Sequence, residues 1–329
     1  MKKLIVNLGI FLLIVGLFFT VTEFSHVAYA DDIITLRLNT VAGPEQAQVK
    51  GYEAARDYIW EESEGKVELS IFHSGLLGEA ADVVLDVHEG ATDISVISPT
   101  WMMEFYKPSG ALEAPYVIRD YDHLYKVLES DIGWELLNGF ESATNTVILD
   151  NWYFGIRHTF STRKATNPEE FDGMIYRVPD SPLFFDAAEV LGASPTPMPV
   201  GEIYLGFETG AMEATFFPYG DAYANAFHEV TDYVIKTGDV VYSIQPIIHE
   251  DKWNEIPEEY QDIILEGFKV GREVNNDIVL EAEETKEDVF REYGLEIVEV
   301  DLEPFIERAM DLWEDYGWTE VVQEIQAVE

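Results

Sequence analysis

Strand-like and helix-like segments alternate near the start of this 329-residue chain. The runs Thr35–Leu38 and Val67–Phe72 flank Gln46–Glu61, in which apolar side chains recur at the spacing of a helix. The short apolar run Ile94–Ile97 is typical of a buried parallel strand. This alternation predicts an α/β fold with ligand-binding loops at the carboxyl ends of the strands, so we expect Trp101 to face a cleft. A tryptophan that only packs its loop is the alternative.

The length and composition predict a two-domain protein. Single hydrophobic cores stop growing at about 250–300 residues, so this chain is expected to form two domains of about 150 residues. Hydrophobic residues make up 47% and aromatic residues 13% of the chain, which excludes a disordered protein. The absence of cysteine excludes disulfides, thiolate metal sites and cysteine catalysis.

One arginine, Arg177, lies in an apolar strand-like run that ends at Pro179, and no further lysine or arginine follows until Lys236. An unpaired guanidinium near a core costs several kcal/mol, and a bound carboxylate offsets that cost through two charge-assisted hydrogen bonds. The pattern therefore favours a ligand clamp. The alternative is a permanent internal partner, supplied by Asp180, Glu202, Glu208 or Glu213.

The residues around Arg177 follow a distinctive order, in the stretches FDGMIYRVPDSP and LGASPTPMPVGEIYLGFETGAMEATFFP. This order resembles the signature region of the solute-binding proteins of TRAP transporters, of the DctP type. The matching residues are Gly173, Arg177, Pro179, Leu191, Gly192, Ala193, Met198, Glu202, Tyr204, Gly210 and Glu213. Met174 departs from the pattern, because the family has a basic residue there. The likeness begins near Ile33 and covers almost the whole remaining chain.

The resemblance implies a two-lobed α/β fold of the periplasmic-binding-protein type, with a hinge and one long helix that spans both lobes. Residues 1–30 would be a signal peptide. Lobe I would comprise residues 31–154 plus 243–282, and lobe II residues 155–242 plus 283–329. The acidic stretch within 270–293 carries an apolar stripe, which is typical of a helix with one solvated face.

The residue patterns and the resemblance together predict a set of ligand-binding residues. Arg177 would bind the carboxylate of the ligand and Arg157 would add a second charge-assisted contact. The remainder of the pocket would be formed by Trp101, Tyr204, Phe217, Tyr219 and Asp180. Arg163 and Lys164, by contrast, are expected to be solvated loop charges.

Phe217 stands where the family often has an asparagine that contacts the ligand. This wall of the pocket is therefore expected to be apolar or aromatic, which favours a ligand with a hydrophobic or cationic part opposite its carboxylate. The alternative is that Phe216 and Phe217 are both core residues.

The N-terminus is typical of a secretory signal, with Lys2 and Lys3, an apolar stretch over Leu8–Val21 and small residues up to Ala30. We expect cleavage after Ala30 and a periplasmic or otherwise extracytoplasmic location, and an uncleaved membrane anchor is the alternative. No later segment is apolar for long enough to cross a bilayer. A membrane partner would therefore be a separate chain.

The charge balance excludes nucleic acid as a partner. The chain has 63 acidic and 20 basic residues, a net charge of −43, and such a surface repels phosphate backbones. The same composition suits concentrated salt, and a salt-rich or alkaline habitat is our hypothesis.

Motifs of known enzymes are missing from the sequence, including His-Glu-x-x-His, Gly-x-Ser-x-Gly and the phosphate-binding loop. We therefore expect no catalysis, no cofactor and no metal. The enzymatic alternative is a secreted hydrolase with paired carboxylates, since 63 acidic residues make chance pairs inevitable.

The sequence as a whole predicts a monomeric extracytoplasmic receptor. Its lobes would close on a small organic carboxylate or zwitterionic solute and deliver it to the small and large permease subunits of a TRAP transporter. A receptor that passes its ligand to a signalling protein would have the same pocket. Sugar acids, dicarboxylates, keto acids and zwitterionic compatible solutes all remain open as ligands.

Overall fold

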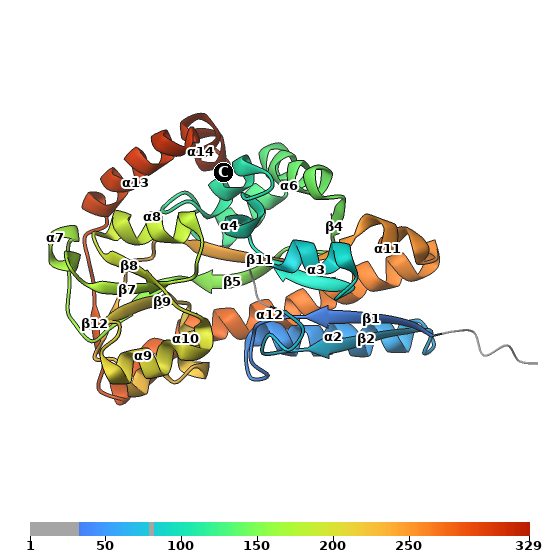
Figure 1. Ribbon diagram of the computed structural model, residues 1–329, viewed down its shortest axis with the longest axis horizontal. Coiled ribbons are helices and arrows are strands. Elements are labelled where there is room, and N and C mark those ends of the chain that lie inside the picture. The colour runs from blue at the N-terminus through green and yellow to red at the C-terminus, as the bar shows by residue number, and fades with distance from the viewer. Residues whose placement is uncertain (1–32, 79–81) are drawn as a thin grey trace, which may run out of the picture. The chain divides into compact units, whose positions relative to one another are not determined.

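The computed structural model describes residues 33–78 and 82–329, and this part of the chain contains two six-stranded sheets with helices around them (Figure 1). The first sheet has the order β2-β1-β3-β11-β4, and β5 also pairs with β11. Its strands are β1 (Ile34–Asn39), β2 (Val67–Phe72), β3 (Ile94–Ile97), β4 (Thr146–Ile148), β5 (Trp152–Ile156) and β11 (Val241–His249). The predicted strand Ile94–Ile97 is confirmed as β3, parallel to β1.

The long strand β11 pairs with different strands along its length. Its second half is antiparallel to β3 and β4, whereas its first half, from Val241 to Ile244, is antiparallel to β5. The register shifts between Tyr242 and Ser243, which marks a bulge in this ribbon. The chain leaves the first sheet along β5 and returns along β11, so these two strands form the connection between the lobes.

The second sheet has the order β12-β10-β6-β9-β7-β8. Its strands are β6 (His158–Ser161), β7 (Ile175–Val178), β8 (Ser194–Pro197), β9 (Ala214–Phe217), β10 (Tyr233–Ile235) and β12 (Glu296–Val298). Strand β7 is parallel to both neighbours, and Arg177 pairs in register with Thr196 and Thr215. Arg177 therefore lies on an interior strand, where its backbone position is fixed from both sides.

Helices connect the strands in the alternation that the sequence predicted. Those of the first half are α2 (Ala47–Glu62), α3 (Val83–Glu89), α4 (Pro99–Met102), the 3-10 helix η2 (Lys107–Glu113), α5 (Tyr121–Leu128) and α6 (Asp131–Thr144). Beside the second sheet lie α7 (Pro168–Phe171), α8 (Pro182–Leu191), η3 (Val200–Glu202), α9 (Ile203–Thr209), α10 (Tyr219–Ala224) and η4 (Phe227–Glu229). The last are α11 (Glu250–Glu255), α12 (Glu258–Glu292), α13 (Glu303–Tyr316) and α14 (Thr319–Gln326).

Helix α12 is the long helix that the family resemblance predicted, and it runs for 35 residues (Figure 1). It packs on α2, β5, α10 and β12, so it contacts elements of both sheets. The close approach to α2 needs two glycines, because a Cβ on Gly51 or Gly271 would lie 2.6 Å from a carbonyl oxygen of the other helix. The two-lobed α/β fold with one long spanning helix is thus confirmed.

Helices α5 and α6 were not predicted from the sequence, although both begin at recognisable caps. The Asp120 side chain accepts a hydrogen bond from the His123 amide, and the Ser130 hydroxyl accepts one from the Gly133 amide. The apolar faces of both helices lie in one core with the C-terminal residues Trp313 and Ile325.

The division into lobes remains a prediction. Helix α13 packs on α8, beside the second sheet, whereas α14 packs on α6 and η2, beside the first. The predicted signal peptide, residues 1–30, lies outside the described residues. In the part of the chain that the structure describes, no helix combines the length and apolarity that a membrane span requires.

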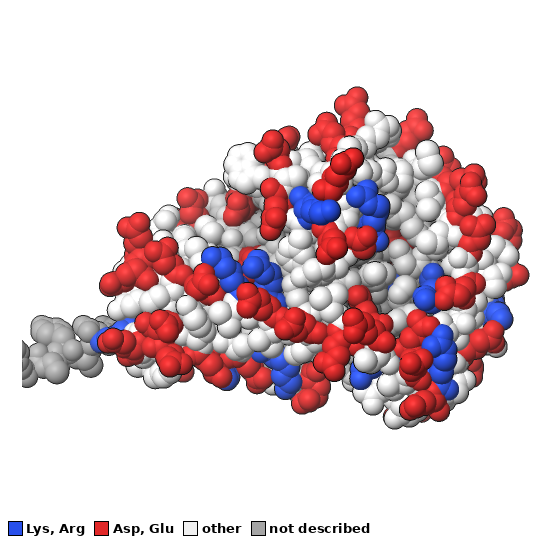
Figure 2. Space-filling view, turned by 180° about the vertical axis from the view of Figure 1, so that it is seen from behind, with Lys and Arg blue, Asp and Glu red and all other residues white. Residues whose placement is uncertain are grey.

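Acidic side chains cover much of the face shown in Figure 2, with lysine and arginine in fewer and smaller groups. This face of the molecule is therefore strongly acidic.

Candidate functional site

A cavity of about 640 Å³ lies between elements of the two sheets. Val41, Gln46 and Trp101 line it from the segments that follow β1 and β3. Strands β5 and β11, which connect the lobes, contribute Phe154 and Tyr242. The second sheet and its loops supply the remaining lining residues, among them Arg157, Arg177, Asp180, Phe184, Met198, Phe216 and Phe217. The cavity therefore has the position of an interlobe ligand site.

Arg177 enters this cavity as a buried charge without an acidic partner. Its residue is 4% exposed, and its Nε donates a hydrogen bond of 2.8 Å to the Met198 carbonyl. No carboxylate of the described residues forms an ion pair with it, and the proposed partners Asp180, Glu202, Glu208 and Glu213 are all in that part. Burial lowers the pKa of the guanidinium to about 10, so it stays charged at neutral pH. A buried, charged, incompletely bonded guanidinium is suited to bind an anion.

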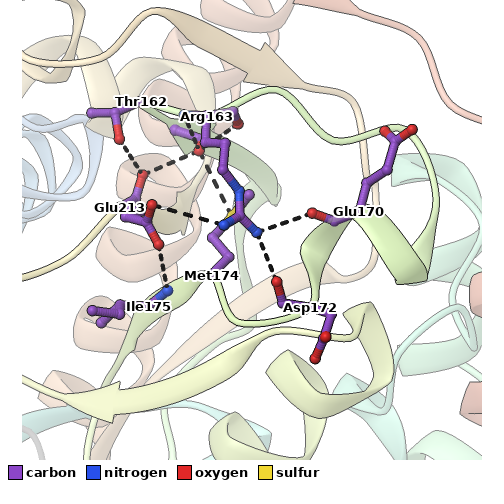
Figure 3. A network of polar contacts seen from close by, with 8 residues as sticks. Thr162, Arg163, Glu170, Asp172, Met174, Ile175 and Glu213 are labelled. Atoms are coloured by element: carbon purple, nitrogen blue, oxygen red, sulfur yellow. Dashed lines mark hydrogen bonds and ion pairs between the residues drawn. The ribbon is translucent and has the colours of Figure 1, made fainter.

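Glu213, one of the proposed internal partners of Arg177, lies beside another arginine, Arg163 (Figure 3). Its carboxylate accepts a hydrogen bond from the Ile175 amide and lies 3.9 Å from Arg163 Nη1. Arg163 also donates to the carbonyls of Glu170 and Asp172. This network fixes the beginning of β7, two residues before Arg177, and keeps Arg163 outside the cavity. Lys164 pairs with Glu296 at the surface.

Arg157 also lines the cavity, but it has a resident acid. Its Nη2 lies 2.5 Å from Asp239 Oδ2, and both side chains are almost fully buried. The guanidinium carbon lies 4.0 Å above the centre of the Phe216 ring, which adds a cation–π contact. The buried Nε has no hydrogen-bond partner among the described residues. The predicted second contact to the ligand would therefore come from Arg157, whose charge is already neutralised by Asp239.

Aromatic rings form a continuous part of the wall. Trp101 lies edge-on to Phe184 with ring centres 5.9 Å apart, and Phe184 stacks on Phe216 at 5.5 Å. Phe217 follows at 6.1 Å from Phe216 and itself lines the cavity. The structure thus brings together Arg177, Arg157, Trp101 and Phe217, and the exposed Asp180 lies at the same cavity.

Two predicted pocket residues lie elsewhere. Tyr204, on α9, is directed away from the cavity, and its hydroxyl donates to Glu229 at 3.0 Å, because Ile203 and Phe207 occupy the buried face of that helix. Tyr219 is buried beside Phe290 and lines a neighbouring cavity of about 520 Å³. Neither tyrosine lines the cavity that Arg177 enters, because packing of α9 and α10 turns both side chains towards other partners.

Several residues of the site were not recognised in the sequence. Glu113 is buried behind the wall and accepts hydrogen bonds from the Thr100 amide and hydroxyl at 2.9 and 2.6 Å. Burial raises its pKa to about 7, although the hydrogen bonds from Thr100 act in the opposite direction. Ser98 donates to Glu113 and accepts from the Tyr242 hydroxyl. This network holds the turn that presents Trp101 to the cavity.

Gln46 connects the two halves of the site. Its side-chain amide donates to Asp221 on α10, and its carbonyl oxygen accepts from the Gly43 amide at 2.5 Å. Asp221 is buried, and burial raises its pKa to about 7. A contact between the start of α2 and α10 bridges elements of the two sheets, so it stabilises the arrangement in which the cavity is enclosed.

The fold, and the cavity between elements of its two sheets, define a two-lobed solute-binding protein. Residues 38–318 match the model of the bacterial extracellular solute-binding proteins, family 7 (DctP), and the chain belongs to this family. The resemblance seen in the sequence, to the solute-binding proteins of TRAP transporters, is confirmed.

Relatives and solved structures agree with this assignment. The chain is 28% identical over 292 residues to the sialic acid-binding periplasmic protein SiaP of Vibrio cholerae, which covers 89% of this chain and 91% of the relative. A TRAP periplasmic solute-binding protein from Roseobacter denitrificans with bound L-galactonate superimposes with a TM-score of 0.83 at 24% identity, over 90% of this chain and 99% of that one. A second protein from that organism, with bound 3-deoxy-D-manno-oct-2-ulosonic acid, gives a TM-score of 0.85 at 22% identity, over 91% and 100%.

Proposed function

We propose that this chain captures a small organic carboxylate outside the cytoplasm by closure of its two lobes. It then delivers the ligand, as a monomer, to the small and large permease subunits of a TRAP transporter. The chain acts by binding and release without a chemical step, and residues 1–30 direct its export.

The observation that carries this proposal is the state of Arg177. The Arg177 guanidinium is buried, faces a cavity and forms no ion pair with an acid of the described residues. A ligand carboxylate would compensate its charge. Its Nε is fixed by Met198, so the terminal nitrogens are held in one orientation before the ligand arrives. A preorganised guanidinium loses little entropy when it binds a planar anion.

The relatives support the same class of ligand. Sialic acid, L-galactonate and 3-deoxy-D-manno-oct-2-ulosonic acid are all organic acids. The relatives are binding proteins, two of them from TRAP systems, and this favours transport over the signalling and hydrolase alternatives. The charged aromatic cavity would also accept a zwitterion through its carboxylate.

Calorimetry with the purified protein and a series of small carboxylates tests the proposal. With a ligand that binds, Arg177→Ala should lower the affinity by about 1.5–3 kcal/mol, because it removes hydrogen bonds between two charged partners. Arg56→Ala is the matched control, since Arg56 is on the exposed side of α2 and pairs with Asp57. An Arg177→Ala variant that binds as tightly as the control would contradict the proposed role.

A further inference from the structure

The polar side chains of the cavity are mostly committed to protein partners. Gln46 is bonded at both ends of its amide, to Gly43 and to Asp221. The Gln48 carbonyl oxygen accepts from Thr40, and the residue is 6% exposed. Tyr242 donates to Ser98 and Arg157 to Asp239, as described above. Among the described lining residues, this leaves Arg177 and the exposed Asp180 as the charged groups without a hydrogen bond to another side chain.

The rest of the lining is apolar. Phe154, Phe184, Phe216, Phe217 and Met198 present rings and a thioether to the cavity. Four prolines also line it, at positions 179, 197, 199 and 218, and proline has no backbone N–H to donate. A ligand that places hydroxyl groups against this wall finds few partners for them.

Unpaired hydroxyl groups discriminate strongly between ligands. Each one that is buried without a partner lowers affinity by about 5- to 150-fold, because its hydrogen bonds to water are lost and not replaced. Hydrocarbon carbons gain from the same burial, since they leave water for an apolar surface. The wall therefore favours a ligand whose body is hydrocarbon over one that is hydroxylated throughout.

The charges of the cavity favour a neutral body over a cationic one. Both Arg157 and Arg177 line it, and Asp239 neutralises the first of these from a buried position. The face of Phe216 already carries the Arg157 guanidinium at 4.0 Å. A ligand ammonium group would meet a wall with one aromatic face already used and with a positive charge at Arg177. Asp180 would attract it, but this carboxylate is exposed, so water and salt screen the attraction.

The space suits a ring or a branched chain. The cavity of about 640 Å³ adjoins a smaller one of about 100 Å³, and the two share Val41, Gln48, Trp101, Phe154 and Tyr242 as lining residues. Cavities of this size accommodate small organic molecules.

We propose that the cavity selects a monocarboxylate whose body is an aromatic ring or a branched hydrocarbon chain, with Phe217 as a specificity-determining residue. This inference rests on the proposed function, because it assumes that Arg177 binds the carboxylate. Phe217 is the informative position, since it ends β9 at the cavity wall and its side chain is half-buried.

Calorimetry with the full-length protein and matched probes separates the two levels of the proposal. The probes are phenylacetate, 3-methylbutanoate, L-galactonate, glycine betaine and phenylacetamide.

We expect phenylacetate or 3-methylbutanoate to bind at least about tenfold more tightly than L-galactonate, because one unpaired hydroxyl group already lowers affinity by that factor. We expect the same preference over glycine betaine, because its body is cationic. Tighter binding of L-galactonate or glycine betaine would overturn this inference and leave the carboxylate site intact. Phenylacetamide binding as tightly as phenylacetate, or no binding of any acid, would instead overturn the proposed function.

A substitution tests the role of Phe217. Phe217→Asn introduces a donor and an acceptor at the wall and should shift the affinity ratio of phenylacetate to L-galactonate by at least fivefold towards the sugar acid. Phe217→Leu, which keeps the wall apolar, should retain the original preference and controls for folding. An unchanged ratio in a folded Phe217→Asn variant would show that Phe217 does not determine specificity.

Discussion

Arg157 and Arg177 line the same cavity, are both buried, and differ in their partners. Arg157 forms an ion pair of 2.5 Å with Asp239, whereas Arg177 has a backbone carbonyl as its hydrogen-bond partner and no described acid in an ion pair. A buried pair of opposite charges satisfies itself and acts as part of the fold. A buried charge without a partner destabilises the folded state, and a bound ligand of opposite charge offsets this destabilisation. The contrast supports our proposal that Arg177 binds the ligand, whereas Arg157 already has an acidic partner in the fold.

The largest expected effect is on stability and follows from breaking the pair. Asp239→Ala leaves the Arg157 guanidinium buried and uncompensated, so the free energy of unfolding should fall by about 3–5 kcal/mol. Urea unfolding measures this change. Adding Arg157→Met should recover much of the loss, because the double variant buries no charge. A single variant as stable as the parent would show that Asp239 does not compensate Arg157.

Asp221 extends the comparison to a buried acid with an amide partner but no cation. Its pKa is raised from 3.8 to about 7 by burial, so the native state holds a proton that the unfolded chain loses above pH 3.8. Stability contributed by this group is therefore present below pH 3.8 and is lost as the pH rises to about 7. Asp221→Asn keeps the acceptor for Gln46 and should be more stable than the parent at pH 8, by at most about 4 kcal/mol.

The stability difference between Asp221→Asn and the parent should vanish near pH 4. Asp57→Asn is the control, because Asp57 is exposed on α2. A difference that does not change between pH 4 and pH 8 would show that Asp221 does not titrate in this window.

Removing the charge of Arg177 should affect stability much less than breaking the Arg157 pair. Arg177→Met fills similar space without a charge, so the free energy of unfolding of the ligand-free protein should change by less than about 1 kcal/mol, or rise. Thermal unfolding without ligand measures it. A loss as large as that of Asp239→Ala would mean that Arg177 has an internal role that the contacts do not show.

The smallest effect per group is expected at the surface. The acidic side chains of Figure 2 repel one another. Added salt weakens this repulsion, and at 0.1 M it largely screens exposed charges that are more than about 10 Å apart. The unfolding midpoint should therefore rise by roughly a few degrees between low salt and 1 M NaCl. A midpoint that stays constant or falls would contradict the hypothesis of a salt-rich habitat.

The parts of the fold that could be predicted are those set by local pattern. Strand Ile94–Ile97 is a short, mainly apolar run, and α12 contains the stretch within 270–293 whose apolar stripe was visible in the sequence. The position of Arg177 at the cavity was also predictable, because an isolated arginine on an apolar strand must reach either an acidic partner or a polar cavity.

The unpredicted parts depend on contacts between distant residues. Asp239 lies 82 residues after Arg157, and no local pattern links them. Gln46 and Asp221 are 175 residues apart in the sequence, and their side chains are in contact because the start of α2 lies beside α10. Tyr204 and Tyr219 lie outside the lining of the Arg177 cavity for a related reason, since the orientation of α9 and α10 is set by their packing.

The most direct test of the central claim compares an acid with its primary amide. In the parent protein the carboxylate should bind at least about tenfold more tightly than the amide of the same body, since charge-assisted hydrogen bonds are stronger than neutral ones. In Arg177→Ala, measured in the same calorimeter, this preference should disappear, whereas Arg56→Ala should retain it. A preference for the acid that survives in Arg177→Ala would show that another group binds the carboxylate and would contradict the account.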